Sequence, residues 1–437
     1  MVNVARLGEV RWNRANTWMF VSFTVGMLLE AYIFGLASIA TGWVAMPKSL
    51  TSLLLAWAPI WLIVGIALAG PISDRMGRKG TFYLTMALYG IGAIGLVFSY
   101  SYVLILVFLA ILLLAAGGEM NTIMVASHEL MPRRHRGKTM MMEINAINLG
   151  GFLLAAVALL SAYSTVSFQR TMIGVTAIVV LLVLLVARRN MPESIRWLEQ
   201  RGRNEEAAAQ VREYYGADWE AHVETQPERA PAARAAEGPH PSTALKMVVM
   251  IVIAAANTIG FGLVAYTLGP KYYPHLTSTI LLVTTGVGFV AGFFGLLADR
   301  ISRKGLLFWT FLGTFVMTAI LWLTTGAWSR DLTLFWILIV LLSAVNSVCY
   351  LTEDTIKAEV WPTLNRGTLT AVARFISIGL YIPAIYLAPY GNVHAYFFFN
   401  TAVWFVGLLA AFVWLVKGNE TGQGVSIDVA SGETAAS

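Results

Sequence analysis

Long apolar runs of about twenty residues, separated by short polar segments, dominate the pattern along this chain. Runs of that length with few charges are typical of transmembrane helices, whereas the alternation expected of a membrane β-barrel is absent. We therefore predict an all-α integral membrane protein with twelve transmembrane helices. The predicted spans cover residues 17–39, 51–71, 81–99, 102–127, 138–162, 169–188, 245–268, 277–298, 307–326, 332–357, 368–390 and 394–416.

A polar segment separates the sixth predicted span from the seventh. Its first part, EEAAAQVREYYGADWEAHVE, predicts one or two short polar helices, and ERAPAARAAEGPHPST has the Pro/Ala-rich composition of a flexible linker. The predicted organisation is an N-terminal six-helix half (1–188), a connector (189–244), a C-terminal six-helix half (245–416) and a polar tail (417–437).

The composition supports a membrane protein and excludes several classes of site. The chain has 437 residues, 57% hydrophobic and 12% charged, with a mean hydropathy of +0.69. A soluble protein carries about twice that charged fraction. The single cysteine, Cys349, excludes an internal disulfide, and the six histidines are scattered, so we expect no metal or other cofactor.

Basic residues predict the orientation in the membrane. Lys48, Arg170, Lys271 and Arg330 are the only Lys and Arg residues in the predicted loops on one side, and most of the other Lys and Arg residues lie on the side of the termini. The positive-inside rule then places both termini in the cytoplasm of a cell whose plasma membrane the chain spans. The net charge of +6 follows from this bias and does not indicate nucleic-acid binding.

Two polar motifs each occur twice. GPISDRMGRKG (70–80) lies between spans two and three, and GLLADRISRKG (295–305) between spans eight and nine. ELMPRRHRG (129–137) and EVWPTLNRG (359–367) share the pattern Glu-x-x-Pro-x-x-x-Arg-Gly. Two related halves of six helices are typical of secondary transporters, whose substrate site lies between the halves near the middle of the membrane.

These motifs resemble those of the major facilitator superfamily, whose hallmark loop is Gly-x-x-x-Asp-Arg-x-Gly-Arg-Lys. The Glu-x-x-Pro-x-x-x-Arg-Gly pair, together with PESIRWL (192–198), is similar to the sugar-porter branch. The resemblance implies transport by alternating access of two six-helix halves. The motif RGKT (136–139) is not a phosphate-binding loop, because Pro132 stands where the first glycine is required, so an ion gradient would supply the energy.

The resemblance also implies a charge network, here called the cytoplasmic latch, that closes the cytoplasmic side. A buried carboxylate is costly without a partner, and Arg side chains or a helix N-terminus can supply one. The predicted latch residues are Gly70, Asp74, Arg75, Gly77, Arg78, Glu129, Arg136, Asp299, Arg300, Arg303, Glu359 and Arg366.

Acidic residues inside the spans are candidates for proton coupling. Glu30 in MLLEAYIFGL resembles the first-span Asp-x-Tyr pattern of proton-coupled porters, with Tyr32 as the tyrosine. A carboxyl in an apolar pocket favours its protonated form, which suits a proton site, although Glu30 could also be a structural acid paired with a neighbouring helix. Glu119 in span four and Asp354 in span ten are further candidates. The related porters carry an Arg in span four, and this sequence has none there.

Polar residues in spans five, seven and eleven are candidates for substrate binding, together with Tyr32. Asn145 and Asn148 share one helix face, where they either line a cavity or tie helices together. In ANTIGFGLVAYTLGP, Asn257 and Tyr266 match parts of the span-seven pattern of sugar porters, but most of the sugar-binding amides of that pattern are missing.

Arg374, in span eleven, needs a partner inside a membrane. It either binds a carboxylate of the substrate or neutralises Asp354, Glu353 or Glu30. Glu353 and Lys357, four residues apart, suit an intrahelical ion pair.

The sequence therefore predicts a transporter, not an enzyme. We expect a monomeric proton symporter that takes up a small polar metabolite, either a sugar or polyol or an organic acid. The alternative is a proton antiporter that exports hydrophobic or cationic compounds. The expected partners are the substrate, protons and the lipid bilayer.

Overall fold

The computed structural model describes residues 10–44, 48–132, 135–216, 218–222, 241–297, 300–362 and 366–422. Their regular structure is almost entirely helical. The N-terminal helices are α2 (Arg14–Ala40), α3 (Lys48–Val97), α4 (Tyr102–Leu130), α5 (Arg136–Leu160) and α6 (Val166–Arg189). The connector forms α7 (Ile195–Gln200), α8 (Asn204–Tyr215) and the 3₁₀ turn η1 (Trp219–His222), which agrees with the short helices predicted there.

The C-terminal helices follow the same order as the predicted spans. They are α10 (Thr243–Gly262), α11 (Leu268–Tyr272), α12 (Thr277–Gly292), α13 (Arg303–Leu323), α14 (Thr325–Trp328), α15 (Leu332–Glu359), α16 (Arg366–Leu387) and α17 (Val393–Lys417). Three short segments join them: the π-helical η2 (Leu263–Thr267) and the 3₁₀ segments η3 (Pro274–Leu276) and η4 (Phe293–Leu297). Within the described residues, eleven helices are long and apolar enough to cross a membrane.

Polar side chains set where several of these helices begin. Asn13, Ser101 and Thr165 accept hydrogen bonds from backbone N–H groups in the first turns of α2, α4 and α6. Ser242 and Asn392 do the same for α10 and α17. Such caps satisfy N–H groups that have no partner inside the helix, which is why these helices begin directly after a small polar residue.

Helix α3 turns back on itself at Gly77, where φ is 82°. A Cβ added to Gly65 would lie 2.2 Å from the Leu114 carbonyl oxygen, and one added to Gly92 would lie 2.6 Å from Leu112 Cγ. Both arms of α3 therefore pack against the same part of α4. In a straight helix, Gly65 and Gly92 would lie about 40 Å apart, because 27 residues separate them. The single 50-residue helix thus contains the two predicted spans 51–71 and 81–99 as two antiparallel arms.

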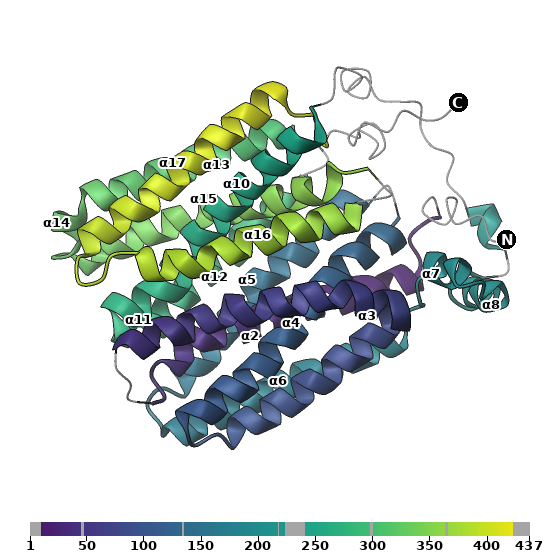
Figure 1. The fold of residues 1–437 in the computed structure, drawn as a ribbon, viewed down its shortest axis with the longest axis horizontal. Coiled ribbons are helices and arrows are strands. Elements are labelled where there is room, and N and C mark those ends of the chain that lie inside the picture. The colour runs from purple at the N-terminus through teal and green to yellow at the C-terminus, as the bar shows by residue number, and fades with distance from the viewer. Residues whose placement is uncertain are drawn as a thin grey trace.

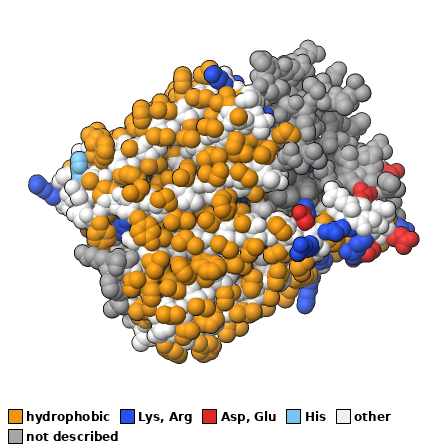
Figure 2. All heavy atoms as spheres, in the orientation of Figure 1, with side chains coloured by type: hydrophobic (Ala, Val, Ile, Leu, Met, Phe, Trp, Pro, Cys, Tyr) orange, Lys and Arg blue, Asp and Glu red, His pale blue; other side chains and the backbone are white. Residues whose placement is uncertain are grey.

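Two groups of helices form the body of the molecule (Figure 1), with α2–α6 on one side and α10–α17 on the other. The groups meet where α5 packs against α12 and α3 packs against α16. On the face shown in Figure 2, hydrophobic side chains predominate along the long helices, and charged side chains gather at the end near α7 and α8. This surface is the one expected of helices that face lipid.

Replacing Gly77 with alanine is expected to destabilise the protein, because an L-residue in the left-handed region costs about 1–2 kcal/mol. The added Cβ would also lie 2.5 Å from Glu193 Oε2. A lower melting temperature in detergent would show the effect. Gly70→Ala is the matched control, because no atom lies within 4 Å of a Cβ at that position. Equal melting temperatures for the two variants would contradict the proposed strain.

Candidate functional site

A cavity lies between the two groups of helices. Its wall combines apolar side chains with a few polar groups, which is the usual composition of a small-molecule site. The residues lining the cavity are Glu30, Ala31, Phe34, Leu62, Met120, Ile147, Asn148, Asn257, Thr258, Phe261, Gly262, Tyr266, Asn346, Ser347, Tyr350, Asp354, Lys357, Arg374, Ser377, Ile378 and Tyr381. Spans five, seven and eleven, whose polar residues are candidates for substrate binding, all contribute to it.

Four buried charged side chains form a cluster at the cavity wall on α15 and α16. Asp354 forms an ion pair with Arg374 and lies 2.7 Å from Lys357 Nζ. Lys357 also lies 2.9 Å from Glu353 Oε1, which is the expected intrahelical pair. Two acids and two bases cancel, as buried charges require. Of the three partners considered for Arg374, Asp354 is the one with which it forms an ion pair.

Three cavity-lining side chains carry polar atoms that have no hydrogen-bond partner among the described residues. They are Glu30 Oε2 on α2, Asn257 Nδ2 on α10 and Arg374 Nη1 on α16. Each side chain is at least nine-tenths buried. Leaving a buried polar atom unpaired costs about 1–3 kcal/mol, so the natural partner of these atoms is a molecule that enters the cavity. Together they offer one acceptor and two donors.

Asn145 and Asn148 connect the two groups of helices. Asn145 Nδ2 donates to the Phe289 carbonyl oxygen of α12 at 3.0 Å, and Asn148 Nδ2 donates to Ser347 Oγ of α15 at 3.0 Å. Ser347 Oγ donates in turn to the Gly288 carbonyl oxygen at 2.7 Å. Of the two roles left open by the sequence, Asn148 combines both, whereas Asn145 ties helices together outside the cavity wall.

Glu119 lies outside the cavity wall, in a second buried ion pair. Its partner is Arg188 on α6, and both side chains are fully buried. Thr85 Oγ1 donates to Glu119 Oε2 at 3.0 Å, while Arg188 Nη1 donates to the Phe82 carbonyl oxygen at 3.0 Å and its guanidinium stacks over the Phe82 ring. This pair packs against α2 at Gly26, one turn before Glu30. A Cβ added to Gly26 would lie 2.5 Å from Glu119 Oε1.

Two tyrosines predicted to bind substrate differ in position. Tyr266 lies in the π-helical segment η2, a local widening of the helix that often occurs at functional sites. Its ring centroid lies 5.1 Å from that of Phe34, which belongs to the other group of helices. Tyr266 lines the cavity. Tyr32 is fully buried outside the cavity wall, and its hydroxyl donates to the Ile173 carbonyl oxygen at 2.9 Å.

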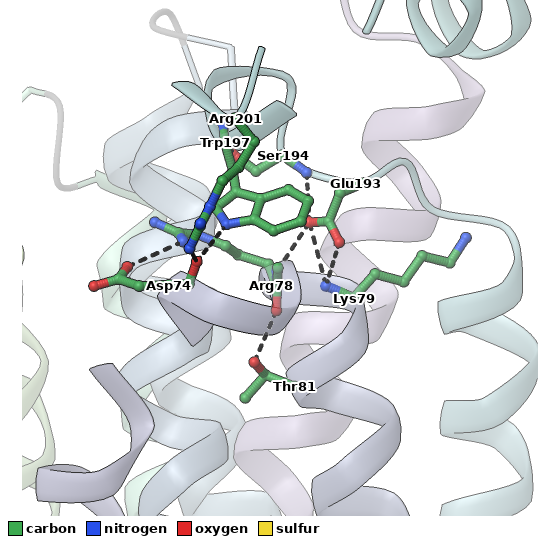
Figure 3. A network of polar contacts seen from close by, with 9 residues as sticks. Asp74, Arg78, Lys79, Thr81, Glu193, Ser194, Trp197 and Arg201 are labelled. Carbon is green, nitrogen blue, oxygen red and sulfur yellow. Dashed lines mark hydrogen bonds and ion pairs between the residues drawn. The ribbon is translucent and has the colours of Figure 1, made fainter. Parts of the chain in front are cut away.

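A separate polar network surrounds the turn of α3 (Figure 3). Glu193 accepts hydrogen bonds from the backbone N–H groups of Arg78 at 2.9 Å and Lys79 at 3.1 Å. Burial raises the pKa of the Glu193 carboxyl, while backbone N–H donors, including those of Arg78 and Lys79, oppose that shift. Trp197 Nε1 donates to the Asp74 carbonyl oxygen at 2.9 Å. The Asp74 carboxylate itself is 75% exposed and contacts Arg78 at 3.6 Å.

The same arrangement recurs at the start of α13. Glu420 Oε1 accepts from the backbone N–H groups of Arg303 at 2.8 Å and Gly422 at 2.7 Å, and Ser302 Oγ donates to Glu420 Oε2. Glu193 follows α6 and Glu420 follows α17. Each acid therefore caps the helical segment that begins within a copy of the GPISDRMGRKG-type motif, and the two acids form a third internal repeat.

Comparison with known proteins identifies the family. The model of the Major Facilitator Superfamily matches residues 14–382. The chain belongs to this superfamily. It is accordingly a multi-pass membrane transporter and not an enzyme, as the sequence predicted.

The proteins to which the chain is similar include proteins named as transporters of sugars or other metabolites. The chain is 34% identical to the glucose transporter GlcP of Staphylococcus epidermidis over a segment that covers 45% of each protein. It is 26% identical to the putative metabolite transport protein YdjK of Escherichia coli, with 97% of this chain and 95% of YdjK aligned. The solved proton:xylose symporter XylE, bound to 6-bromo-6-deoxy-D-glucose, has a similar fold, with a TM-score of 0.75, 20% identity, and coverage of 96% of this chain and 99% of XylE.

The predicted latch residues are partly brought together. Arg303 and Glu359 form a buried ion pair. Arg136 donates to the Met131 carbonyl oxygen at 3.4 Å and Arg366 to that of Trp361 at 3.1 Å, which are equivalent contacts in the two groups of helices. Arg75 and Arg300 are exposed. The side chain of Glu129 and the whole of Asp299 lie outside the described residues.

Sequence analysis missed three residues of these networks. Arg188 stands at the end of the sixth predicted span, and its pairing with Glu119 depends on helix packing that residue spacing does not encode. Glu193 lies within PESIRWL, but its contact with the α3 turn was not anticipated. Glu420 lies in NET after the last predicted span, and Glu193 lies in PES at the corresponding place after the sixth span. No other feature of the sequence marks Glu420.

Proposed function

We propose that this transporter is a proton symporter that takes up a neutral polyhydroxy compound, a sugar or a polyol. The observation that carries the proposal is the set of unpartnered atoms in the cavity, one acceptor on Glu30 and two donors on Asn257 and Arg374. A hydroxyl group both donates and accepts, so neighbouring hydroxyls of one molecule can satisfy all three atoms. A carboxylate only accepts, so it would leave an ionised Glu30 without a donor.

The charges around the cavity also favour a neutral substrate. Arg374 is neutralised by Asp354, and Lys357 lies between Asp354 and Glu353, so this cluster has no net positive charge to attract an anion. An ionised Glu30 would add a negative charge to the cavity wall. This arrangement supports a sugar or polyol over an organic acid.

We assign the coupling proton to Glu30 and not to Glu119 or Asp354. Glu119 is paired with Arg188, and Asp354 with Arg374 and Lys357, so a proton on either acid would leave a buried base without its anion. Among the described residues, Glu30 has no such ion pair, and one of its carboxylate oxygens has no partner. It can therefore take up or lose a proton without leaving a buried base unpaired.

The proposed topology has twelve crossings, because the two arms of α3 each account for one. Both termini then lie in the cytoplasm of the cell, and the protein acts as a monomer in the plasma membrane. Two six-helix halves, 1–188 and 245–416, would move against each other, with connector 189–244 and tail 417–437 on the cytoplasmic side. The latch residues and the Glu193 and Glu420 caps would hold that side closed.

The names of several relatives support uptake of a sugar or polyol over export of a drug. Besides the glucose transporter, the chain matches an arabinose-proton symporter of Escherichia coli over 42% of that protein, at 30% identity. It also matches a probable inositol transporter of Arabidopsis thaliana.

Melting temperatures of the purified protein in detergent would test the substrate class. One pool contains D-glucose, L-arabinose, D-xylose and myo-inositol, and the other contains small mono- and dicarboxylates. A ligand at about 100 times its dissociation constant stabilises the fold by about 2.7 kcal/mol. We expect a shift with the first pool that is lost in Asn257→Ala and kept in Asn190→Ala, which lies outside the cavity wall. A shift with carboxylates alone would overturn the proposal.

A further inference from the structure

Glu143 on α5 is a buried acid to which the proposed transport cycle assigns no role. Its side chain is only 1% exposed, and neither carboxylate oxygen has a hydrogen-bond partner among the residues that the structure describes. Two turns separate it from Arg136, where α5 begins, and one turn separates it from Ile147 and Asn148 at the cavity wall. Glu143 therefore lies between the cavity and the end of α5 that we place at the cytoplasm.

Apolar side chains surround this position. Met140 and Ile147, which share a helix face with Glu143, belong to one hydrophobic cluster together with residues of α2, α4 and α15. We call it the methionine-rich cluster. Its methionines are Met19, Met27, Met120, Met124, Met131, Met140 and Met191.

The methionine-rich cluster is continuous with the cavity wall. Ala31, Met120 and Ile147 belong to both. Glu30 lies between two members of the cluster on α2, Met27 and Ala31. The cluster therefore occupies the space that a proton leaving Glu30 for the cytoplasmic end of α5 would cross.

The charged side chains of α15, which packs against α5, are all engaged in ion pairs. On α15, Glu353 and Asp354 pair with Lys357, and Asp354 also pairs with Arg374 of α16. Glu359 pairs with Arg303.

On the N-terminal helices, one carboxylate oxygen of Glu30 on α2 has no partner among the described residues, whereas two other charged groups are engaged. Glu119 of α4 pairs with Arg188 of α6, and Arg136 of α5 donates to the Met131 carbonyl oxygen. The polar side chain that acts on Glu143 is the Ser127 hydroxyl of α4, which faces it without completing a hydrogen bond.

A purely structural carboxylic acid would be expected to donate its O–H to a neighbouring acceptor, because an unmade buried hydrogen bond costs about 1–3 kcal/mol. Glu143 makes no such bond, and Ser127 Oγ also lacks a partner. Two facing polar groups without partners, inside an apolar cluster, indicate a site whose partner is water that enters when the cluster opens.

We propose that Glu143 is a second proton-binding site, on the path by which the proton leaves Glu30 for the cytoplasm. Its carboxylate forms an O–H bond with a proton that water carries from Glu30. That bond breaks when water from the cytoplasmic side reaches the carboxyl between α4 and α5 and accepts the proton. The inference rests on the proposed proton symport, and it adds a release step that Glu30 alone does not provide.

Infrared difference spectra of the full-length protein in liposomes, recorded between pH 5 and pH 9, test the site with protons as the only ligand. We expect two carboxylic-acid C=O bands that change with pH. Glu143→Gln should remove one and Glu30→Gln the other, while Glu143→Asp should shift the first band without abolishing it. Glu206→Gln, at an exposed position of α8, should remove neither.

The transport role is tested with the four-compound sugar and polyol pool and a pH dye inside the vesicles. Glu143→Gln should slow proton release into the vesicle by about tenfold or more, the smaller end of typical proton-transfer contributions. Exchange of labelled for unlabelled pool compounds, which moves no net proton, should stay close to that of the unchanged protein.

Two results would overturn the inference. One is a Glu143 band that stays constant from pH 5 to pH 9, which would make the residue a structural acid. The other is a Glu143→Gln variant with unchanged proton release. Failure of the underlying proposal looks different: the unchanged protein would move no protons with the pool, whatever residue stands at position 143.

Discussion

Arg188→Met is expected to destabilise the protein by about 3–5 kcal/mol, because it leaves the Glu119 carboxylate buried without its cation. Both side chains are fully buried, and within the described part of the chain Thr85 supplies the only other hydrogen bond to Glu119. The variant also loses the contacts of Arg188 with the Phe82 carbonyl oxygen and ring, which join α6 to the second arm of α3. Thermal unfolding in detergent and the yield of monodisperse protein would measure the effect.

A double variant identifies the cause. Glu119→Leu combined with Arg188→Met removes both charges, and replacing a whole buried pair with apolar residues is often neutral or stabilising. The double variant should therefore melt well above Arg188→Met alone. Arg203→Met is the surface control, because its pair with Glu206 is about half exposed and such pairs contribute at most about 1 kcal/mol. A double variant as unstable as Arg188→Met would show that the packing of Arg188, and not its charge, is what matters.

Glu30→Gln is expected to abolish accumulation driven by a pH gradient. A gradient of one pH unit is worth about 1.4 kcal/mol per proton and supports up to about tenfold accumulation of a substrate coupled to one proton. Glutamine cannot carry a proton, so the internal and external concentrations of the pool compounds should become equal. Their exchange across the membrane without a gradient should persist, since the amide keeps the size of the side chain and can still donate and accept hydrogen bonds.

Proteoliposomes loaded at one pH and diluted into another measure both quantities. Glu206→Gln, the same exchange of acid for amide on exposed α8, should accumulate the pool compounds normally. Tenfold accumulation by Glu30→Gln would exclude Glu30 as the proton site and leave Glu119 and Asp354 as the candidates.

The spans could be predicted because their signal is local. An apolar run of about twenty residues is visible wherever it occurs, and caps such as Ser101 and Thr165 mark where it becomes helix. The prediction was less exact where tertiary structure alters a helix. The seventh span was expected over 245–268, yet α10 ends at Gly262 and continues through the π-helical η2 and α11 to Tyr272.

The site was predictable as a set of residue types and less so as a set of contacts. Buried acids such as Glu30 and Asp354 are candidates because a charge inside a membrane is costly. Only helix packing decides that Arg374 of α16 lies beside Asp354 and that, among the described residues, no cation lies at ion-pair distance from Glu30. Asn145 and Asn148 share a helix face by spacing alone. Which of them reaches the cavity depends on α12 and α15, which lie far along the chain.

The Glu420 cap bears on how the protein should be handled in the laboratory. Glu420 bonds the first turn of α13 although it follows the last long helix, so the segment after α17 is part of the folded body up to Gly422. A reporter or affinity tag fused before Glu420 would remove a carboxylate that α13 uses, whereas a junction after Gly422 would leave it in place. A fluorescence screen for expression that joins the reporter directly to α17 would therefore select against the intact fold.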